Sequence, residues 1–334
     1  MENLISVIVC TYNQERTIVR TLDSILMQQC HVPYEIIIGE DCSTDTTLTI
    51  CQQYAERYPD IVRLLANKTN KGIVDNYFNC ILNSNGIYIA DCAGDDFWVD
   101  PLKLEKEVTI LEKHPNVTLV HTDWVKYQES TGRTYPSPKK PFTAPITDGH
   151  IMLEAIIIQR ELPVIQLCTS VYRTSIIRDA LSKNEALFRN KDFGCEDLQI
   201  ATLMSACGKI AYIPNVTLNY SQGENTVSHS PDYHKQFLFT RQVTHQSYLL
   251  AQHYQIKTLA TEQFFRQRVF ELVMFAFRAH DKQLLTETLQ YEKEWNIQRS
   301  YKTSLLFHIM RYECLWITAL QVRHIFINVK RLFH

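Results

Sequence analysis

The stretch Tyr88-Ile-Ala-Asp-Cys-Ala-Gly-Asp-Asp-Phe-Trp98 joins a short apolar run to two adjacent carboxylates, Asp95 and Asp96. Residues 87–90 are typical of a buried strand, which opens after Gly86. Two carboxylates at the mouth of a buried strand lose hydration and repel each other unless a cation lies between them. The usual cation is a hard divalent ion, Mg²⁺ or Mn²⁺, with phosphate oxygens as further ligands. The stretch therefore predicts a metal and phosphate site at the end of a strand.

A structural alternative is that Asp95 and Asp96 cap the helix that follows. Asp100 and Pro101 already provide residues that are favoured at the N-cap and at the first helical position. The earlier pair is then left without a capping role, which favours the metal interpretation.

The composition is that of an ordinary globular enzyme. The chain has 334 residues, a formal net charge of −2 and an isoelectric point near 6.6, whereas a nucleic-acid-binding domain is usually basic. The N-terminus enters a strand-like run directly and lacks the basic region and cleavage site of a signal peptide, so we expect a cytoplasmic protein. The ten cysteines include no Cys-x-x-Cys pair, which indicates reduced thiols rather than disulfides or zinc ligands.

Residues 4–123 alternate between strand-like and helical patterns. Runs rich in Ile and Val predict strands at 4–10, 34–39, 61–66, 87–92 and 117–122. Between them, apolar residues recur at helical spacing. Continuous apolar strands joined by helices predict an α/β fold, with a mostly parallel sheet and helices on both faces.

Unusual polar residues follow each of the first four predicted strands. They are Thr11-Tyr12-Asn13, Glu40-Asp41, Asn70-Lys71-Gly72 and Asp95-Asp96. Ligands bind at the carboxyl ends of the strands in an open parallel sheet, so these residues are expected to meet at one crevice. Singly, each has a simpler explanation, since Asn13 could cap the first helix and residues 43–45 the second. No Gly-x-Gly-x-x-Gly or P-loop sequence follows the first strand, so a bound phosphate would need a metal and side chains to neutralise it.

These motifs, in this order, resemble the family 2 glycosyltransferases. The matching residues are Ser6-Val-Ile-Val-Cys-Thr-Tyr-Asn13, Tyr34-Glu-Ile-Ile-Ile-Gly-Glu-Asp-Cys-Ser-Thr-Asp-Thr47, Asn70-Lys-Gly72 and Gly94-Asp-Asp-Phe-Trp98. The similarity covers the alternating region and continues more loosely through Cys195-Glu-Asp-Leu-Gln199 and Lys209-Ile-Ala-Tyr-Ile-Pro214. It implies a GT-A (Rossmann-like) fold, an inverting mechanism and a nucleotide-sugar donor, UDP-linked or related.

The resemblance also implies roles for individual residues. Thr11 and Tyr12 would form the floor of the uracil site, and Asp41 would accept a hydrogen bond from uracil N3. Asp95 would be the metal ligand of the family's Asp-x-Asp motif. The donor-binding residues implied in this way are Thr11, Tyr12, Asn13, Asp41, Asn70, Asn76, Asp95 and Asp96, with Asn70 and Asn76 beside the ribose or the diphosphate.

Glu196 and Asp197 resemble the family's catalytic acidic pair, with Asp197 as the general base. An inverting displacement needs one carboxylate to take the proton of the acceptor hydroxyl as it attacks C1 of the sugar. Repulsion between neighbouring carboxylates should raise one pKa, which suits a base. The pair also fits the start of a helix, since Leu198, Ile200 and Ala201 follow, and the two roles are compatible.

Two positions depart from the family pattern. Ala93 replaces the first Asp of Asp-x-Asp, so Asp95 would hold the ion largely alone, with diphosphate oxygens and water. The Tyr-Arg-x-His motif of many relatives is Tyr220-Ser-Gln-Gly223 here. His229, a little further along the chain, is a candidate replacement metal ligand, although a His in a polar loop is more often merely solvated.

We expect residues 1–230 to form the catalytic domain, with 1–123 as its nucleotide-binding half and 124–230 as its acceptor half. Residues 124–150 predict a loop or hairpin over the crevice, and a strand is expected near 166–172. Trp98 would either stack on a sugar ring or be a core aromatic. Residues 231–334 are expected to be a helical extension, with helices at 234–254, 258–279, 281–296 and 303–332.

The last predicted helix is apolar along much of its length and basic at both ends. It carries Leu306, Ile309, Leu315 and Trp316, yet its uncharged run, 314–322, is too short to cross a bilayer. We expect it to contact the inner face of the membrane peripherally, or to bind a partner such as a second copy of the chain in a homo-oligomer. Packing as ordinary core is the alternative.

The sequence thus predicts a metal-assisted transferase of a hexosyl or N-acetylhexosaminyl group to a glycan or lipid-linked acceptor, in cell-surface polysaccharide synthesis. Two alternatives remain. A nucleotidyltransferase would need a Gly-rich basic loop after the first strand, where Thr11-Tyr12-Asn13-Gln14 lies instead. A degenerate, nucleotide-sugar-binding scaffold is consistent with Ala93 and the missing His. The joint presence of Asp41, Asp95 and Asp197 argues against it.

Overall fold

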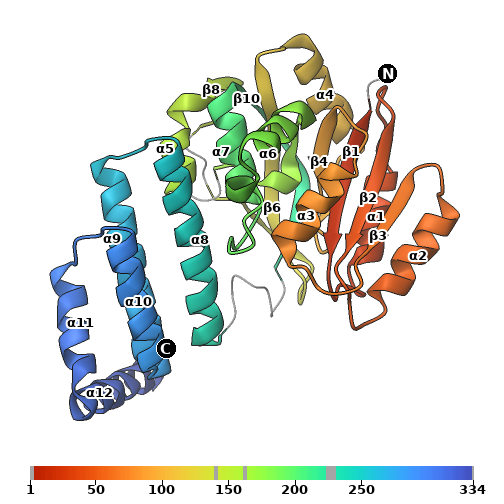
Figure 1. Ribbon diagram of the computed structural model, residues 1–334. Coiled ribbons are helices and arrows are strands. Elements are labelled where there is room, and N and C mark those ends of the chain that lie inside the picture. The colour runs from red at the N-terminus through yellow and green to blue at the C-terminus, as the bar shows by residue number, and fades with distance from the viewer. Residues whose placement is uncertain (1–3, 139–141, 161–163, 223–230, 333–334) are drawn as a thin grey trace. The chain divides into compact units, whose positions relative to one another are not determined.

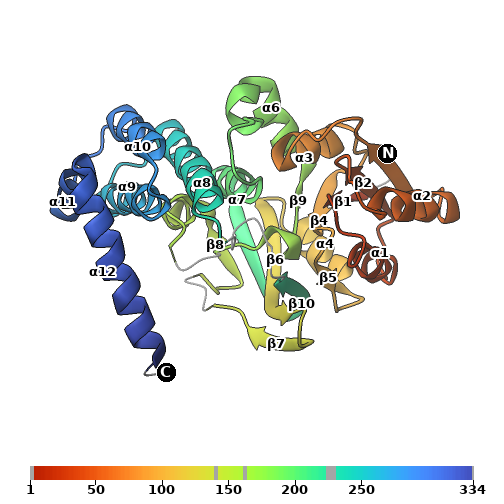
Figure 2. The ribbon, with the colours of Figure 1, turned by 90° about the horizontal axis from the view of Figure 1, so that it is seen from below.

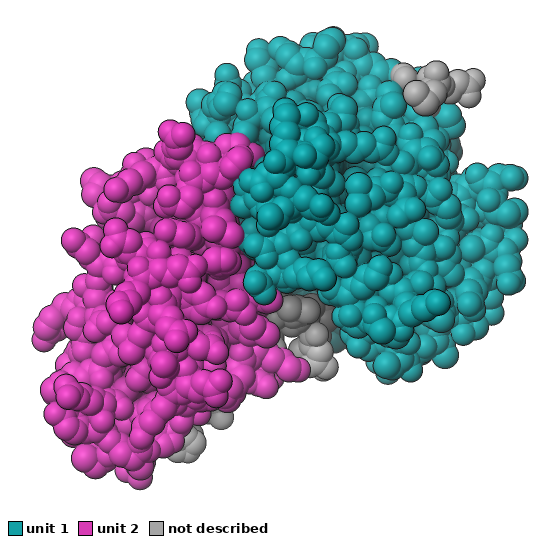
Figure 3. All heavy atoms as spheres, in the orientation of Figure 1, with its two compact units in different colours: residues 1–223 teal, residues 224–334 magenta. Residues whose placement is uncertain are grey.

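The computed structural model describes residues 4–138, 142–160, 164–222 and 231–332 (Figure 1). The chain divides into two compact units, residues 1–223 and residues 224–334 (Figure 3). The first unit contains the β-sheet, and the described part of the second unit is helical.

The first unit is built on one ten-stranded sheet with the strand order β3-β2-β1-β4-β9-β6-β10-β5, from which β7 and β8 branch. Strands β3, β2, β1 and β4 run parallel, β9 is antiparallel to both β4 and β6, and β10 pairs in parallel with β6. The carboxyl ends of β1, β2, β3 and β4 therefore lie at one edge. The strands are β1 (Ile5–Thr11), β2 (Tyr34–Glu40), β3 (Val62–Ala66), β4 (Tyr88–Asp91), β5 (Phe97–Trp98), β6 (Val117–Gln128), β7 (Arg133–Pro136), β8 (Ile146–Asp148), β9 (Ser170–Arg173) and β10 (Lys209–Gln222).

Helices cover both faces of this sheet. Figure 2 shows α1 and α4 on one face and α3 and α6 on the other. The helices of the first unit are α1 (Ile18–Leu26), α2 (Thr47–Arg57), α3 (Ile73–Leu82), α4 (Lys103–Lys113), α5 (Leu153–Ile157), α6 (Thr174–Phe188) and α7 (Asp197–Cys207). The mostly parallel α/β sheet with helices on both faces confirms the predicted fold class.

The central strands are buried on both faces. Val7 and Val9 of β1 pack in one apolar core with Ile18 of α1 and Cys51 of α2, while Ile8 between them is equally buried outside that core. A strand buried on both sides has no polar face, so its sequence is a continuous apolar run rather than an alternating one. This is why the strands could be recognised from sequence.

All five strands predicted in the alternating region are present, as β1, β2, β3, β4 and β6. The predicted hairpin is also present, because β6 continues to Gln128 and pairs with β7 across a turn in which Gly132 has φ 65°. The strand expected near 166–172 is only partly right, since Leu167–Thr169 forms a 3₁₀ turn and β9 starts at Ser170.

The capping role assigned to Asp100 needs correction. Helix α4 begins at Lys103, and its N-cap is Leu102, which provides no side-chain cap. The Asp100 carboxylate instead accepts a hydrogen bond from the Leu102 backbone N–H (2.9 Å) and pairs with Lys106 (2.5 Å). Asp100 therefore orders the turn that leads into the helix rather than its first residue.

The described part of the second unit consists of five helices with two apolar clusters. Val273, Phe277, Met310 and Trp316 form one cluster, and Phe237, Val269, Leu272 and Trp295 form the other. The helices are α8 (Tyr233–His253), α9 (Leu259–Ala279), α10 (Lys282–Glu294), α11 (Tyr301–Arg311) and α12 (Glu313–Leu332).

The single helix predicted at 303–332 is wrong. Tyr312 has an extended backbone (φ −111°, ψ 114°) that separates α11 from α12, and the side chain of Trp316 in α12 is buried against Phe277 of α9. No Pro or Gly marks this break, so the sequence pattern could not show it. Within the described residues, none of the helices combines the length and the apolar character that a bilayer crossing requires.

Candidate active site

The loops after β1 and β2 are tied together by hydrogen bonds. The Asn13 side chain accepts a hydrogen bond from the Thr44 backbone N–H (2.8 Å), and the Asn13 backbone N–H donates to Ser43 Oγ (2.9 Å). Asn13 has φ 53°, a left-handed conformation that Asn tolerates better than most residues. It does not cap α1, whose N-cap is Thr17. Of its neighbours, Tyr12 is 46% exposed and so reachable by a ligand.

The Asp41 carboxylate orders the loop after β3. Its Oδ1 accepts hydrogen bonds from the Asn67 side chain (2.9 Å) and the Lys71 backbone N–H (2.8 Å), and its Oδ2 accepts one from the Gly72 N–H (2.9 Å). A carboxylate has about four lone-pair sites, so Asp41 can still accept a further hydrogen bond. The predicted contact with uracil N3 stays a prediction.

Asn70 and Asn76 differ in how far a ligand could reach them. Asn70 is exposed, and its side chain donates to the Asp41 backbone carbonyl (3.1 Å). Asn76 is buried, and its amide donates to the Gly39 carbonyl (2.8 Å) and accepts from Asn67 (2.8 Å). The buried Asn76 amide stabilises the loop through its hydrogen bonds, whereas the Asn70 amide is exposed at the surface.

Arg20 of α1 holds the loop that carries Asp95 and Asp96. Its guanidinium donates to the Asp95 backbone carbonyl (3.0 Å), pairs with Glu129 in the β6–β7 turn (2.5 Å) and lies 4.1 Å from the centre of the Phe97 ring. These contacts hold the backbone of the loop, and the Asp95 carboxylate itself is hydrogen-bonded by the Gln14 side chain.

Asp95 and Asp96 differ in burial. Asp95 is partly exposed, and burial raises its pKa. Asp96 is buried and accepts a hydrogen bond from the Ser221 N–H (2.8 Å), and its pKa is raised by burial and then by the charge of Asp95. Its other oxygen, Oδ2, is buried without a hydrogen-bond partner among the described residues.

Gly94 allows this loop to lie against the end of β1. A Cβ at this position would lie 2.3 Å from Gln14 Oε1 and 2.8 Å from Thr11 Oγ1, closer than non-bonded atoms approach. Both of those oxygens are buried without a hydrogen-bond partner among the described residues. Buried polar atoms normally have partners, so their clustering here is typical of a ligand or ion site.

Asp197 is the first residue of α7, and Glu196 is its N-cap without a side-chain cap bond. The predicted helix start is therefore confirmed. Burial raises the pKa of Asp197 to about 6, and it raises the pKa of Glu196 well above its ordinary value, with repulsion from Asp197 as the second cause. Desolvation, rather than the repulsion expected from sequence, is the main cause of both shifts.

The charge of Asp197, at the start of α7, acts on carboxyl groups at and after the end of β4. The charge of Asp197 raises the pKa values of Asp96 and Asp91, and burial together with Asp96 and Asp197 raises that of Tyr220. The predicted base therefore lies near enough to the predicted metal-binding loop for its charge to act on Asp96. His229 lies outside the described residues.

The oxygen ligands near Asp95 fit a hard divalent cation. The Asp95 carboxylate is hydrogen-bonded by the Gln14 side chain, and the Gln14 amide oxygen and the Thr11 hydroxyl lie against the neighbouring Gly94. Mg²⁺ or Mn²⁺ prefers such oxygen ligands, completed by phosphate oxygens and water. A different group, formed by Cys30, His31 and Glu105, also has ligand atoms within 4.8 Å of one another. There His31 is hydrogen-bonded to Glu105 (2.6 Å), which an ordinary ion pair explains.

Trp98 belongs to the core. It is 1% exposed, its Nε1 donates to the Cys168 carbonyl (3.0 Å), and the Lys103 ammonium lies 4.5 Å from the ring centre. A buried ring cannot stack on a sugar, so of the two roles considered for Trp98 the core role holds.

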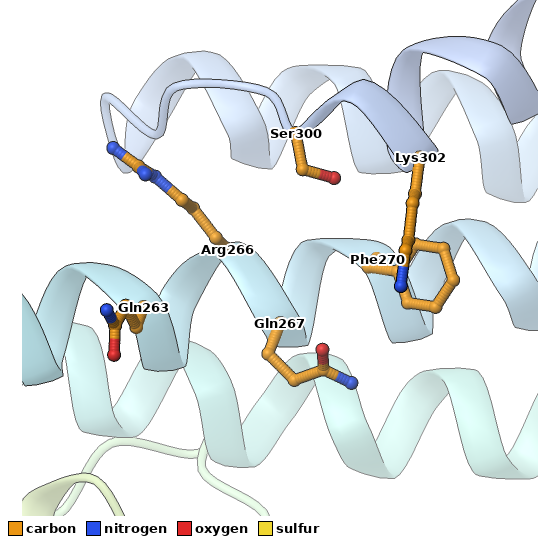
Figure 4. A pocket seen from close by; sticks show the side chains of 6 residues that line it. All are labelled: Gln263, Arg266, Gln267, Phe270, Ser300 and Lys302. Atoms are coloured by element: carbon orange, nitrogen blue, oxygen red, sulfur yellow. The ribbon is translucent and has the colours of Figure 1, made fainter.

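Two cavities are lined by other residues. One, of about 470 Å³, lies in the first unit and is lined by Asp75, Glu185, Ala186, Arg189 and Lys191. The other, of about 230 Å³, lies in the second unit between α9 and the start of α11 (Figure 4) and is lined by Gln263, Arg266, Gln267, Phe270, Ser300 and Lys302. No predicted donor-binding residue lines either cavity. The polar residues at the carboxyl ends of the parallel strands therefore identify the candidate site better than cavity size does.

Comparison with known proteins agrees with this geometry. The family model described as glycosyl transferase family 2 matches residues 6–181, more than half of the chain. The chain belongs to glycosyltransferase family 2. This membership favours glycosyl transfer over the nucleotidyltransferase alternative.

Several curated relatives share part of the sequence. An uncharacterised protein of Mycobacterium tuberculosis is 42% identical over 114 residues, which is 34% of this chain and 33% of that protein. The Bacillus subtilis protein EpsE, named as a glycosyltransferase, is 39% identical over 158 residues, 45% of this chain and 56% of EpsE. Staphylococcus aureus TarS, a poly(ribitol-phosphate) β-N-acetylglucosaminyltransferase, is 29% identical over 176 residues, 52% of this chain and 28% of TarS. The chain thus spans between a quarter and somewhat over half of these relatives.

Solved structures show the same fold. The S. aureus TarS fragment 1–349 in complex with UDP-GlcNAc aligns with a TM-score of 0.51 and 20% identity, covering 85% of this chain and 83% of that one. A mannosyltransferase from Pyrobaculum calidifontis in complex with GDP-Man and Mn²⁺ aligns with a TM-score of 0.51 and 17% identity, covering 99% and 88%. These likenesses confirm the GT-A fold.

Proposed function

We propose that this protein is an inverting glycosyltransferase that moves a hexosyl or N-acetylhexosaminyl group from a UDP-sugar to a glycan or lipid-linked acceptor. One observation carries the proposal. In a family 2 domain, the Asp95 loop follows the carboxyl end of the parallel strand β4, and the carboxyl pair at the start of α7 lies near enough for the charge of Asp197 to raise the pKa of Asp96. A site with a donor-side carboxylate and a separate base has what such a displacement requires.

The donor side is assigned to the first three loops and the Asp95 loop. Tyr12 is exposed at the end of β1, Asp41 retains hydrogen-bonding capacity, and Asn70 lies at the surface beside it. UDP is favoured as the nucleotide because structural neighbours from S. aureus are complexes with UDP-GlcNAc and with UDP. Asn13 and Asn76 act through the loops, which their side chains hold.

The acceptor side is assigned to Asp197. Its pKa near 6 leaves it ionised at neutral pH and still basic enough to take the proton of a hydroxyl that attacks the sugar from the opposite face. Burial and then repulsion from Asp197 raise the pKa of the neighbouring Glu196 well above its ordinary value. When bound, Mg²⁺ or Mn²⁺ would neutralise the leaving diphosphate, and Asp95 is the residue that would hold it.

The second unit is assigned a peripheral role at the inner face of the membrane, in cell-surface polysaccharide synthesis. Leu315, Ile317 and Val322 of α12 are exposed apolar residues, whereas Trp316 is buried in the unit's own core. Part of the apolar pattern that suggested a membrane contact is therefore used in internal packing. The exposed part remains available to a membrane or to a second copy of the chain.

Release of UDP from UDP-GlcNAc, with water as the acceptor and Mn²⁺ present, tests the proposal. An enzyme should release UDP, and release should fall when Mn²⁺ is chelated. A protein that binds UDP-GlcNAc but releases no UDP with any donor or acceptor would be the nucleotide-sugar-binding scaffold instead, which Ala93 would favour.

A further inference from the structure

The position of Asp197 depends on the end of helix α6. Gln199 lies with Asp197 in the first turn of α7 and is fully buried. Its side-chain amide donates a hydrogen bond to the carbonyl of Phe188, the last residue of α6 (3.1 Å). A shift of the end of α6 would therefore move the start of α7 with it.

Helix α6 alone does not fix the direction of its own last turn. Asn184 has non-helical backbone angles (φ −155°, ψ 67°), so the helix is kinked there and residues 185–188 form a separate turn. The Asn184 side chain accepts a hydrogen bond from the Leu187 N–H (3.2 Å), which starts this turn. Contacts with other elements must therefore hold the turn in place.

An ion pair joins this turn to α3. Arg189, directly after the turn, donates a hydrogen bond from Nε to Oδ1 of Asp75 (2.7 Å), and its Nη2 lies 2.6 Å from the same oxygen. The Arg189 and Asp75 side chains are only 22% and 14% exposed, so solvent screens this pair less than it screens a surface pair. Figure 2 shows α3 and α6 on the same face of the sheet. The end of α6 is thus tied to α3.

Helix α3 begins at the loop that Asp41 orders. Gly72 is the N-cap of α3, and its N–H donates to the Asp41 carboxylate (2.9 Å). Asp75 lies in the first turn of the same helix. A continuous series of contacts therefore runs from Asp41 through the start of α3 and the Asp75–Arg189 pair to the end of α6 and the start of α7.

We propose that Arg189 is a positioning residue, which through its ion pair with Asp75 holds the start of α7 so that the Asp197 carboxylate meets the attacking hydroxyl. The inference rests on the proposed function, in which Asp197 is the general base. Arg189 takes no part in the proton transfer; it fixes the segment that carries the base. A displacement of about 1 Å at a reacting group can cost roughly a hundredfold in rate, so a contact outside the reacting groups can control turnover.

Substitutions on both sides of the ion pair test this role. Arg189→Ala and Asp75→Ala should each lower kcat for UDP-GlcNAc hydrolysis by roughly tenfold to a hundredfold, with KM for UDP-GlcNAc unchanged. Arg189→Lys should retain most of kcat, because both Arg189 nitrogens contact one oxygen, which a single ammonium can also reach. Lys183→Ala is the matched control, since it breaks the exposed pair between Lys183 and Asp179 within α6. Equal kcat values in Arg189→Ala and Lys183→Ala overturn the inference.

The pH profile adds a readout that a loss of stability alone would not change. Burial is the cause that raises the pKa of Asp197 to about 6, so release of the segment into water should lower this pKa towards its ordinary value. The rise of kcat with pH should therefore move to lower pH in Arg189→Ala and stay near pH 6 in Lys183→Ala. An unchanged profile in Arg189→Ala overturns the inference. The titratable groups that face Asp197 are left intact in both variants; they are Asp91, Asp96, Cys168, Cys195, Glu196 and Tyr220.

Hydrogen–deuterium exchange of the full chain without donor separates this inference from the proposed function. The amides of residues 190–199 should exchange faster in Arg189→Ala than in the wild type, and those of α1 should not change. Asp75→Asn keeps an oxygen acceptor opposite Arg189 and should show a smaller increase, and it carries the comparison if Arg189→Ala does not fold. Unchanged exchange overturns the inference. Absence of UDP release from the wild type overturns the proposed function, whereas the exchange result still decides whether Arg189 holds the segment.

Discussion

Asp197 must be ionised at neutral pH and yet retain an appreciable affinity for a proton, and its partly buried place at the start of α7 provides both. Asp197→Asn should lower UDP-GlcNAc turnover on the order of 10²–10⁴-fold while calorimetric donor binding stays near wild type, because the base acts on the acceptor. Wild-type turnover should rise as pH increases through about 6, since only the ionised form accepts a proton. Glu196→Gln is the matched control and should be much milder, because Asp197 and not Glu196 is the proposed base. Near wild-type turnover in Asp197→Asn would remove Asp197 as the base.

Removing the Asp95 side chain and removing the Asp41 side chain should affect UDP binding differently, depending on whether metal is present. Asp95→Ala should weaken binding of UDP in the presence of Mn²⁺ and leave metal-free binding unchanged, whereas Asp41→Ala should weaken binding even without metal. Asp41 also orders the loop at Lys71 and Gly72, so Asn67→Ala, which removes another bond to Asp41, controls for loop disorder. Isothermal titration with and without Mn²⁺ measures both effects, and equal losses of metal-free binding in Asp95→Ala and Asp41→Ala would contradict the division of roles.

The positions of Asp41, Asp95 and Asp197 follow largely from the sequence. The first two end parallel strands, and parallel strands place their carboxyl ends at one edge. The contacts of Arg20 and Asp91 could not be predicted in this way, because Arg20 pairs with Glu129 and Asp91 accepts a hydrogen bond from Tyr172, each across distant parts of the chain. A single sequence carries no signal for such pairs. The one available indication for Asp91 was a carboxyl group inside an otherwise apolar strand.

At the scale of elements, α12 contains both a buried core residue, Trp316, and the exposed apolar residues Leu315, Ile317 and Val322. Replacing Leu315, Ile317 and Val322 together with Ser should abolish binding to anionic vesicles without lowering the Tm, since these side chains are exposed. Trp316→Ala is the contrasting variant and should destabilise the unit by roughly 3–5 kcal/mol, as loss of a buried Trp does. Vesicle flotation and thermal unfolding measure the two effects. Undiminished vesicle binding in the triple variant would exclude α12 as the contact.

The bounds of the helices were less predictable than their existence. Trp316 and Met310 are buried in the apolar cluster around Phe277, so truncation from Lys302 would remove both side chains from that cluster. Deletion therefore cannot separate a membrane contact from core packing, and surface substitution can. The break at Tyr312 that makes this packing possible is set by tertiary contacts, which helical periodicity does not report.

At the scale of the whole molecule, the two units have separate apolar cores and should respond differently to the donor. UDP-GlcNAc with Mn²⁺ at 100 times its dissociation constant should stabilise the unit that binds it by about 2.7 kcal/mol. Hydrogen–deuterium exchange should then show protection in the loops that carry Asp41 and Asp95 and little change in α9 and α10. Protection confined to the helical unit would place the donor site elsewhere.

Ala93 and Gly94 are neighbours with opposite tolerance for change. Ala93 is partly exposed and packs at the rim of the apolar core, so a saturation library at this position should yield folded variants, and acidic ones among them should bind metal more tightly. At Gly94 any side chain would collide with Gln14 and Thr11, so a library there should return almost exclusively the parental codon. The side chain of this loop can therefore vary at position 93 and not at position 94. Laboratory evolution towards a different metal requirement would have to proceed through position 93.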